Sequence, residues 1–579
     1  MRLVIVGGVA GGMSAAARAR RLDESAEIIV LEKGPWVSFA NCGLPYFVSG
    51  EIEDRNALIV QTPGQLRASL NLDVRTNHEV VGLDASTRTV HVRTAEGTRE
   101  IGYDALVLAP GAEARRPDIP GLDSSRVRTL RTVDDAVALR DEANRATTAV
   151  VLGAGFIGLE AAEALVRRGL DVTVVELAPQ ILPPLDAPMA NLALAALSRL
   201  GITVRTGVSA TAIRPGTDED SVALSDGNEL RAGLIVLSAG VQPATAVFER
   251  DGVYCEHGAI LVDGRGRTNL PGVWAVGDAT AASDPLTGAR RPVALAGPAN
   301  RAGRLVADDI FGLPAARPQP APLGTAIVRL GDTTAAMTGA NKRTLMEAAI
   351  DHHTIDLHPT QYAGYFPGAV PFALRVHFAA NDGRLLGAQA VGTDGVDKRI
   401  DVLATAVRAG LTIGDLIDVD LAYSPPYGNA KDPVNLAGML GQNVLDGITR
   451  LWHAENLEAE TERALILDTR NADEFASGHV PGSLNVPHTE LRARLDEVHR
   501  AAAGRPVRVL CASGMRSYLA HRVLVAGGFD SATLSGGMRS LRATLGEQAS
   551  AYLVHLPPDG ARIPPASTTT ERQTVRSEP

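Results

Sequence analysis

The amino-acid sequence predicts an α/β protein whose N-terminal part contains two βαβ units, and two observations support this prediction. Short apolar runs alternate with Ala-rich helical stretches; the runs lie at residues 3–6, 28–31, 106–109, 149–152, 172–175 and 234–237. Such runs are typical of parallel strands that are buried on both faces. In addition, residues 1–35 and 148–178 share one order: strand, Gly-rich turn, Ala-rich helix, strand, Glu. This order indicates a duplicated unit.

The remainder of the 579-residue chain contains further regions, in agreement with the roughly four domains that its length suggests. A Pro-rich stretch at 313–322 reads as a linker. After it, expected strands at 326–330 and 372–378 combine with a helix near 397–409 in an α+β pattern. A compact α/β pattern follows between about 464 and 554. The last residues, 556–579, are rich in Pro, Ser and Thr and are predicted to be disordered.

Composition excludes several classes of protein. Lys and Arg total 56 against 66 Asp and Glu, and aromatic residues make up 4%, so a nucleic-acid partner is not expected. No apolar run of about 18 residues and no basic, cleavable leader is present, so we expect a cytoplasmic protein without membrane partners. The three cysteines, Cys42, Cys255 and Cys511, exclude a disulfide framework and a zinc site of cysteine pairs, and we expect no metal.

The second glycine turn carries a complete dinucleotide motif. Gly153, Gly155 and Gly158 form G-x-G-x-x-G between an expected strand and helix, and Glu176 ends the next strand. The glycines let the backbone approach a pyrophosphate at the N-terminus of the helix. A carboxylate at Glu176 would accept a hydrogen bond from a ribose 2′-OH and repel a 2′-phosphate. We therefore expect NADH rather than NADPH.

The first glycine turn departs from this motif, because Val9 stands where the second glycine belongs. Glu32, followed by Lys33, still lies 20 residues after the last glycine of the turn. Two further expected strands end in glycine turns, at Gly111 and at Gly277-Asp278. The first glycine turn itself consists of Gly7, Gly8, Val9, Ala10, Gly11 and Gly12.

Together these segments resemble the flavoprotein disulfide reductases, which have two Rossmann-like dinucleotide-binding domains and an α+β dimerisation domain. The resemblance implies FAD on the first glycine turn and NAD(P)H on the second, with Asp278 on the ribityl chain of FAD. It also implies a homodimer. The implied bounds are 1–112 and 244–312 for the FAD domain, 113–243 for the NADH domain and 323–447 for the dimerisation domain.

Cys42 lies where this family carries its redox sulfur. Most members have a C-x-x-x-x-C pair there, but this chain has Ser38 four residues before a single cysteine. The segment closely resembles the coenzyme A-disulfide reductases. A single thiolate forms a mixed disulfide, a persulfide or a sulfenic acid instead of an internal disulfide. We expect a helix after Cys42 to lower the pKa of its thiol. Cys255 lies in no motif and is interpreted as structural.

The same resemblance implies a coenzyme A site. Arg18 and Arg21 are three apart on the first helix and share a face, whereas Arg20 is interpreted as a solvated side chain. Ser38 and Asn41 match further ligand-binding positions. A Tyr-rich loop and a second tyrosine resemble segments with which each subunit completes its neighbour's site, and a tyrosine hydroxyl is a plausible proton donor. These residues are Tyr365, Tyr423, Tyr427 and Lys431.

Residues 460–555 resemble the rhodanese domain. The motifs at 467–470 and 478–483 precede an expected active loop that runs from Cys511 to Ser517 and includes Arg516. Backbone N–H groups of such a loop, before a helix, form an anion nest that suits a thiolate or a persulfide. Because Cys511 is present, a docking domain without activity is the less favoured reading.

The combination predicts an FAD- and NADH-dependent reductase of sulfur compounds. Cys42 would reduce coenzyme A persulfide, polysulfide or coenzyme A disulfide, and Cys511 would carry sulfane sulfur. Coenzyme A and small sulfur compounds are therefore the expected partners. Two alternatives remain open: a water-forming NADH oxidase or peroxidase that uses a Cys42 sulfenic acid, and a sulfur-relay or redox-sensing module. Asn41 and Tyr423 favour the reductase over the oxidase.

Overall fold

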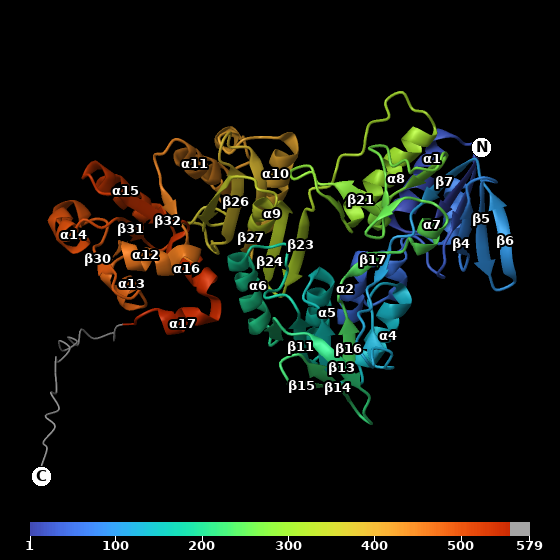
Figure 1. Ribbon diagram of the computed structural model, residues 1–579, viewed down its shortest axis with the longest axis horizontal. Helices are drawn as coiled ribbons and strands as arrows, with labels where there is room; N and C mark the ends of the chain where they lie inside the picture. The colour runs from blue at the N-terminus through green and yellow to red at the C-terminus, as the bar shows by residue number, and fades with distance from the viewer. Residues whose placement is uncertain (556–579) are drawn as a thin grey trace, which may run out of the picture. The chain divides into compact units, whose positions relative to one another are not determined.

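The computed structural model describes residues 1–555 and contains two compact units, Met1–Asp446 and a second unit from Gly447 on (Figure 1). The predicted disordered tail, residues 556–579, lies outside the described residues. Each unit is built on α/β architecture, as predicted. In the described part of the chain, no helix combines the length and the apolar character that crossing a membrane requires.

A five-stranded parallel sheet forms the first layer of the first unit. Its strand order is β20-β7-β1-β2-β3. The helices α1 (Ala10–Leu22) and α8 (Ala296–Ile310) pack against each other beside this sheet. They can approach closely because Gly303 has no Cβ: a Cβ there would lie 2.1 Å from the Gly11 carbonyl oxygen. The strands are β1 (Arg2–Val6), β2 (Glu27–Leu31), β3 (Asp73–Arg75), β7 (Ala105–Leu108) and β20 (Val273–Ala275).

A second parallel sheet repeats the first, as the duplicated sequence pattern predicts. Its order is β12-β11-β10-β16-β9, with α5 (Phe156–Arg167) after the central strand β10. In each of the two βαβ repeats of the first unit, the helix (α1 or α5) thus follows a glycine turn at the carboxyl end of a central strand, where a dinucleotide site is expected. The strands are β9 (Val127–Arg128), β10 (Thr148–Leu152), β11 (Asp171–Glu176), β12 (Thr203–Thr206) and β16 (Leu234–Leu237).

A five-stranded antiparallel sheet of the first unit has the order β23-β24-β27-β26-β25, and smaller sheets accompany the three large ones. Asp186, at the start of α6 (Ala187–Arg199), joins this antiparallel sheet to the second parallel sheet: its carboxylate pairs with Arg375 at 3.1 Å and with His377 at 3.0 Å, and all three are buried. The strands are β23 (Ala326–Leu330), β24 (Thr333–Gly339), β25 (His352–Leu357), β26 (Ala373–Ala379) and β27 (Leu385–Gly392), and the helix α10 spans Val396–Ala409.

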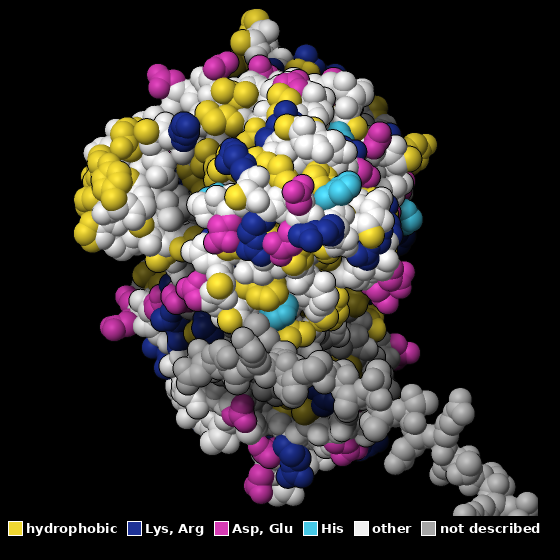
Figure 2. Space-filling view, turned by 90° about the vertical axis from the view of Figure 1, so that its left-hand side faces the viewer, with side chains coloured by type: hydrophobic (Ala, Val, Ile, Leu, Met, Phe, Trp, Pro, Cys, Tyr) yellow, Lys and Arg dark blue, Asp and Glu magenta, His cyan; other side chains and the backbone are white. Residues whose placement is uncertain are grey.

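The second unit is a smaller parallel sheet in the order β28-β32-β31-β29-β30. One apolar cluster includes Trp452 and Leu541, and another includes Leu491 and Leu524. On the face of the described chain drawn in Figure 2, acidic and basic side chains are interspersed rather than segregated. The elements are β28 (Leu451–Trp452), β29 (Leu465–Asp468), β30 (Leu484–Asn485), β31 (Val507–Leu510), β32 (Ser531–Leu534) and the helix α15 (Met515–Ala526).

Candidate functional site

The first glycine turn has a backbone that only glycine permits. Gly7 has a φ of +98°, and a Cβ there would lie 2.0 Å from the Ala109 carbonyl oxygen. A Cβ at Gly12 would lie 1.9 Å from the Gly7 carbonyl oxygen. The Glu32 carboxylate accepts hydrogen bonds from the Gly8 N–H at 2.8 Å and the Gly34 N–H at 2.9 Å. Glu32 therefore holds the turn at the carboxyl end of its strand.

The second glycine turn repeats this arrangement. Gly153 has a φ of +112°, and a Cβ at Gly158 would lie 2.1 Å from the Gly153 carbonyl oxygen. Glu176 accepts from Ala154 N–H at 2.6 Å and Ala178 N–H at 2.7 Å, in the same way as Glu32. Around Gly155, by contrast, a Cβ would meet nothing within 4 Å.

Both turns fit a dinucleotide. Neither α1 nor α5 has a side-chain cap at its N-terminus, so the first backbone N–H groups of each helix are not capped by the chain's own side chains. The open space over Gly155 adds room for a phosphate beside these N–H groups. The residues present are therefore compatible with the pyrophosphate of a dinucleotide at each turn.

Asp278 lies where a third segment meets the first sheet. It belongs to a short 3-10 turn, Gly277–Ala279, and Gly277 has a φ of +79°. The Arg131 Nη2 lies 3.1 Å from the Asp278 Oδ2, and the Arg131 Nε donates to the Ala112 carbonyl at 3.0 Å. Sequence reasoning did not identify Arg131, because it lies in no motif and only tertiary contacts bring it to Asp278. Gly111 has a φ of +69°, and Lys33 is exposed.

Cys42 lies in the 3-10 turn η1 (Asn41–Gly43), directly before the helix α2 (Leu44–Ser49). The Cys42 side chain is exposed. Ser38, four residues earlier and with a φ of +47°, donates its backbone N–H to the Gly8 carbonyl at 2.8 Å. This bond attaches the Cys42 segment to the first glycine turn. Asn41, beside Cys42, is half-buried.

The prediction that α2 lowers the pKa of the Cys42 thiol is wrong for the described chain. Although Cys42 is exposed, the protein around the thiol removes enough water to raise its pKa. The carboxylates of Glu160 and Asp278 raise the pKa further, and Arg131 partly opposes them. The helix starts where it was expected, directly after the Cys42 turn, but burial and the two carboxylates set the direction of the shift.

The arginines of α1 have three different environments. Arg18 Nε pairs with the Asp308 carboxylate of α8 at 2.5 Å. Arg21 is exposed, as a ligand-binding residue requires. The interpretation of Arg20 as a solvated side chain is wrong: it is 4% exposed. It donates to four backbone carbonyls, those of Leu70, Asn71, Asp23 and Glu24.

The predicted tyrosines lie in two adjoining loops. The hydroxyls of Tyr365 and Tyr423 are 3.4 Å apart, although 58 residues separate them in the chain. Asn429 Nδ2 donates to the Thr360 carbonyl at 2.9 Å and ties the two loops together. Both tyrosines, Tyr427 and Lys431 are exposed, so all four side chains are accessible on the described chain.

In the second unit, Cys511 occupies the predicted loop between β31 and α15. Its side chain is buried, and the Gly514 N–H donates to Cys511 Sγ at 3.1 Å. Gly514 has a φ of +110°, which directs this N–H inward. Arg516 pairs with both Glu474 oxygens at 2.6 and 2.7 Å. This pairing raises the pKa of the Arg516 guanidinium, and the proximity of Cys511 raises it further. The sulfur thus has an N–H donor and a nearby guanidinium, an arrangement that stabilises an anionic sulfur.

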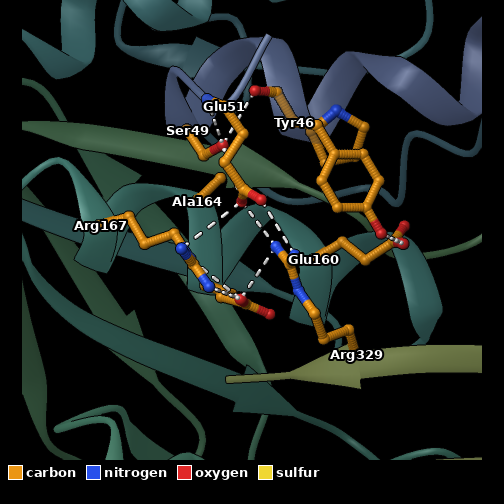
Figure 3. Close-up of a pocket in the computed structure, with 9 residues that line it drawn as sticks. Tyr46, Ser49, Glu51, Glu160, Ala164, Arg167 and Arg329 are labelled. Carbon is orange, nitrogen blue, oxygen red and sulfur yellow. Dashed lines mark hydrogen bonds and ion pairs between the residues drawn. The ribbon is translucent and has the colours of Figure 1, made fainter. Parts of the chain in front are cut away.

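A pocket beside the Cys42 segment contains charged residues that sequence reasoning missed (Figure 3). It is lined by side chains from α2, α5 and β23, among them Tyr46, Glu160 and Arg329. Glu160 follows the glycine motif within α5 and carried no separate signal in the sequence, because an acidic residue in an amphipathic helix is ordinarily solvated.

Models of known protein families match three parts of the chain. The family model described as pyridine nucleotide-disulphide oxidoreductase matches residues 1–303, and the dimerisation domain of the same family matches residues 325–433. The rhodanese-like domain matches residues 449–544. FAD and NAD(P)H are typical cofactors of this family.

Individual relatives cover most of the chain. The coenzyme A disulfide reductase of Staphylococcus haemolyticus (strain JCSC1435) is 34% identical over 442 residues, which are 76% of this chain and 98% of that protein. The crystal structure of reduced Bacillus anthracis CoADR-RHD is 36% identical, with a TM-score of 0.92, and the match covers 96% of this chain and 99% of that one.

A third relative is the NAD-dependent persulfide reductase from A. fulgidus. Its structure is 35% identical, with a TM-score of 0.88, and the match covers 93% of this chain and 100% of that one. This chain therefore belongs to the pyridine nucleotide-disulphide oxidoreductases, as an NAD(P)H-dependent flavoprotein disulfide reductase of the CoADR-like group with a C-terminal rhodanese domain.

Proposed function

We propose that this enzyme passes electrons from NADH through Cys42 to coenzyme A persulfide, polysulfide or coenzyme A disulfide, and that Cys511 handles sulfane sulfur. The observation that carries the proposal is one exposed cysteine beside the first glycine turn, combined with a second cysteine in an anion nest. The named activities of the Staphylococcus and A. fulgidus relatives support the same substrate class.

The two glycine turns would hold the cofactors. FAD, when bound, accepts a hydride from NADH and supplies two electrons to sulfur. The first turn, Glu32, Lys33, Gly111, Gly277 and Asp278 would bind FAD, and Arg131 would keep Asp278 in place. Gly153, Gly155, Gly158 and Glu176 would bind NADH. Glu176 would favour NADH, because its carboxylate would face the 2′-phosphate of NADPH.

Cys42 would act as the nucleophile toward the substrate. Its thiolate attacks the sulfane sulfur of coenzyme A persulfide, an S–S bond breaks, and the coenzyme A thiolate leaves. A hydroxyl of the Tyr365–Tyr423 pair would donate a proton to the leaving thiolate. Two electrons and a proton then release the transferred sulfur from Cys42 as sulfide and restore its thiolate.

The coenzyme A site would be completed by a second subunit. Arg18 and Arg21 lie on α1, which begins at the first glycine turn, and Ser38 donates its N–H to the Gly8 carbonyl of that turn. Tyr365, Tyr423, Tyr427 and Lys431 would reach the site of the partner in a homodimer. The dimerisation-domain match at residues 325–433 supports this arrangement.

Cys511 would carry sulfane sulfur as a persulfide. The Gly514 N–H would stabilise the anionic sulfur, and Arg516 would contribute positive charge beside it. Because Cys42 and Cys511 belong to separate units, a small thiol such as coenzyme A would carry sulfur between them.

The test is to measure NADH consumption with coenzyme A persulfide, coenzyme A disulfide and oxygen side by side. We expect turnover with the two sulfur substrates and its loss in Cys42→Ser with FAD still bound. Turnover with oxygen alone would instead support the NADH oxidase. No steady turnover with any of the three would support a relay or sensor.

A further inference from the structure

The interior of the second unit contains four buried polar side chains between α15 and β32. Ser531 and Thr533 alternate along β32 and share one face of it, and Ser517 and His521 lie one turn apart on α15. All four are at most 3% exposed. Their neighbours on β31, directly beside the two strand residues, are valines of an apolar cluster. Burying polar groups here costs free energy unless they are hydrogen-bonded, and apolar side chains would fill the same space.

The four side chains form two separate pairs. His521 Nδ1 lies 3.0 Å from Ser531 Oγ. Burial lowers the pKa of His521 to about 4, so this pair is uncharged at neutral pH. In the second pair, Thr533 Oγ1 donates to Ser517 Oγ at 2.8 Å, and Ser517 Oγ donates to the Gly514 carbonyl at 2.9 Å. Among the described residues, only this second pair is hydrogen-bonded to the loop that carries Cys511.

Gly514 is the part of this loop whose conformation most needs to be fixed. Its N–H donates to Cys511 Sγ at 3.1 Å, with φ at +110° and ψ at −32°. Glycine has the widest choice of backbone conformations, and a Cβ at this position would meet nothing within 4 Å. Packing on that side therefore does not hold Gly514. The start of the loop is held differently, since the Cys511 carbonyl accepts from Met538 N–H at 2.8 Å.

The hydroxyl of Ser517 supplies a contact that holds Gly514 in place. The Gly514 carbonyl accepts from Tyr518 N–H at 2.9 Å, which is the ordinary first bond of a helix. The Ser517 bond to the same carbonyl is additional. Because Thr533 donates to the Ser517 oxygen, the Ser517 proton is directed to the carbonyl, and the chain of bonds strengthens each member. Gly514 is thus fixed at its C=O by the hydroxyls while its N–H faces the sulfur.

We propose that Ser517 and Thr533 are positioning residues for Cys511, which hold Gly514 so that its N–H faces the sulfur in its anionic form. An ordered N–H stabilises both the thiolate that attacks a sulfane donor and the persulfide anion that results. The inference rests on the proposed role of Cys511 as a carrier of sulfane sulfur. It extends that role to two buried side chains that act through Gly514.

The test follows sulfur transfer from inorganic polysulfide to Cys511 in the full-length, FAD-containing enzyme at neutral pH without NADH. The Cys511 thiolate forms an S–S bond with a terminal sulfur of polysulfide, the neighbouring S–S bond breaks, and the shortened polysulfide leaves as an anion. Samples are denatured at timed intervals in an alkylating reagent. Mass spectrometry of the Cys511 peptide then gives the fraction that carries an additional sulfur.

In Ser517→Ala we expect this loading to be roughly three- to tenfold slower, because a misaligned N–H stabilises the anionic sulfur less. Thr533→Val removes only the outer hydroxyl, so its loading should slow by a smaller factor. Thr533→Ser keeps a hydroxyl at this position and should recover most of the rate lost in Thr533→Val.

Ser531→Ala is the matched control, because it breaks the other buried pair between the same two elements. It should lower the melting temperature of the second unit about as much as Ser517→Ala does, yet leave the loading rate unchanged. Loading of Ser517→Ala at the wild-type rate or faster, an equal slowing in Ser531→Ala, or equal rates in the two Thr533 variants would overturn the proposal. Absence of transferred sulfur on Cys511 in the wild type would instead overturn the proposed function.

Discussion

At the residue scale, the two strand-end glutamates show how a carboxylate can serve both the fold and the ligand. Glu32 and Glu176 each accept two backbone N–H groups of the adjoining segments, so each is fixed before any ligand arrives. Each oxygen still has a further lone pair with which it can accept from a ribose hydroxyl. The same carboxylate therefore holds the turn and would select the dinucleotide.

For Glu176 this gives a prediction about the nucleotide. NADH should have a higher kcat/KM than NADPH, since a 2′-phosphate would face a fixed carboxylate. Glu176→Gln should reduce the preference by about tenfold, because the amide carries no charge but still accepts a hydrogen bond. Steady-state kinetics with both nucleotides would measure this. Equal kcat/KM values in the wild type would show that Glu176 does not exclude the phosphate.

Arg20 gives a prediction about stability. Arg20→Ala should lower the free energy of unfolding by about 2 to 3 kcal/mol, because it leaves four partly buried carbonyls without their donor. Arg21→Ala, on the same helix but exposed, should change it by less than about 0.5 kcal/mol. Thermal or urea unfolding of both variants would measure the difference. Equal effects would contradict the structural role assigned to Arg20.

At the element scale, the close approach of α1 and α8 depends on Gly303. A Cβ there would meet the backbone at Gly11, 2.1 Å away, and backbone cannot move aside as a side chain can. The two helices would have to separate, and the first glycine turn, which opens α1, would move with them. The geometry of one glycine in α8 is thus transmitted to the first glycine turn, where we propose that FAD binds.

Gly303→Ala should therefore destabilise the first unit and weaken the binding of FAD. Gly297→Ala is the matched control in the same helix, since a Cβ there would meet only the flexible end of Arg301, at 3.5 Å. It should be neutral or stabilising by up to about 1 kcal/mol, as Ala is the better helix former. Flavin fluorescence during thermal unfolding would follow both. A similar melting temperature and flavin content in the two variants would refute the packing argument.

At the scale of the whole molecule, the accessible tyrosines of the antiparallel sheet region predict a homodimer. Tyr365 and Tyr423 are held together by their own chain but are exposed, with Tyr365 77% accessible. Sedimentation at assay concentration should show a dimer. Mixing Cys42→Ser with a Tyr365→Phe/Tyr423→Phe variant should restore part of the activity, since one of the mixed sites has all groups intact. A fully active monomer would contradict this.

The two units predict a division of labour between the cysteines. Cys511→Ala should leave the reduction of coenzyme A disulfide nearly unchanged but impair the use of polysulfide, which we expect the second unit to accept. Rates with both substrates, for wild type and variant, would measure this. An equal loss with both substrates would indicate a structural role for Cys511, and no loss with either would show that Cys511 is idle in this reaction.

The sequence by itself determined the α/β class and the duplicated glycine turns, and it identified Cys42 and Cys511 as the candidate reactive cysteines. These features are local: glycine spacing, strand-length apolar runs and a motif each depend on neighbouring residues. The prediction of two glycine turns, each followed at the end of the next strand by Glu32 or Glu176, needed no tertiary contact. The family resemblance of the Cys42 and Cys511 segments was likewise carried by contiguous residues, and the comparisons confirmed the family.

Only the tertiary structure decided what surrounds each charge. Arg20 proved buried because α1 meets backbone carbonyls of a segment 50 residues away. The pKa of Cys42 proved raised rather than lowered because the surrounding protein removes water from the thiol, and the carboxylates of Glu160, 118 positions along the chain, and of Asp278 add to this effect. Arg131 and Arg329 found their partners in the same way. Ionisation depends on burial and on charges that are close in space, and sequence order does not specify either for residues so far apart.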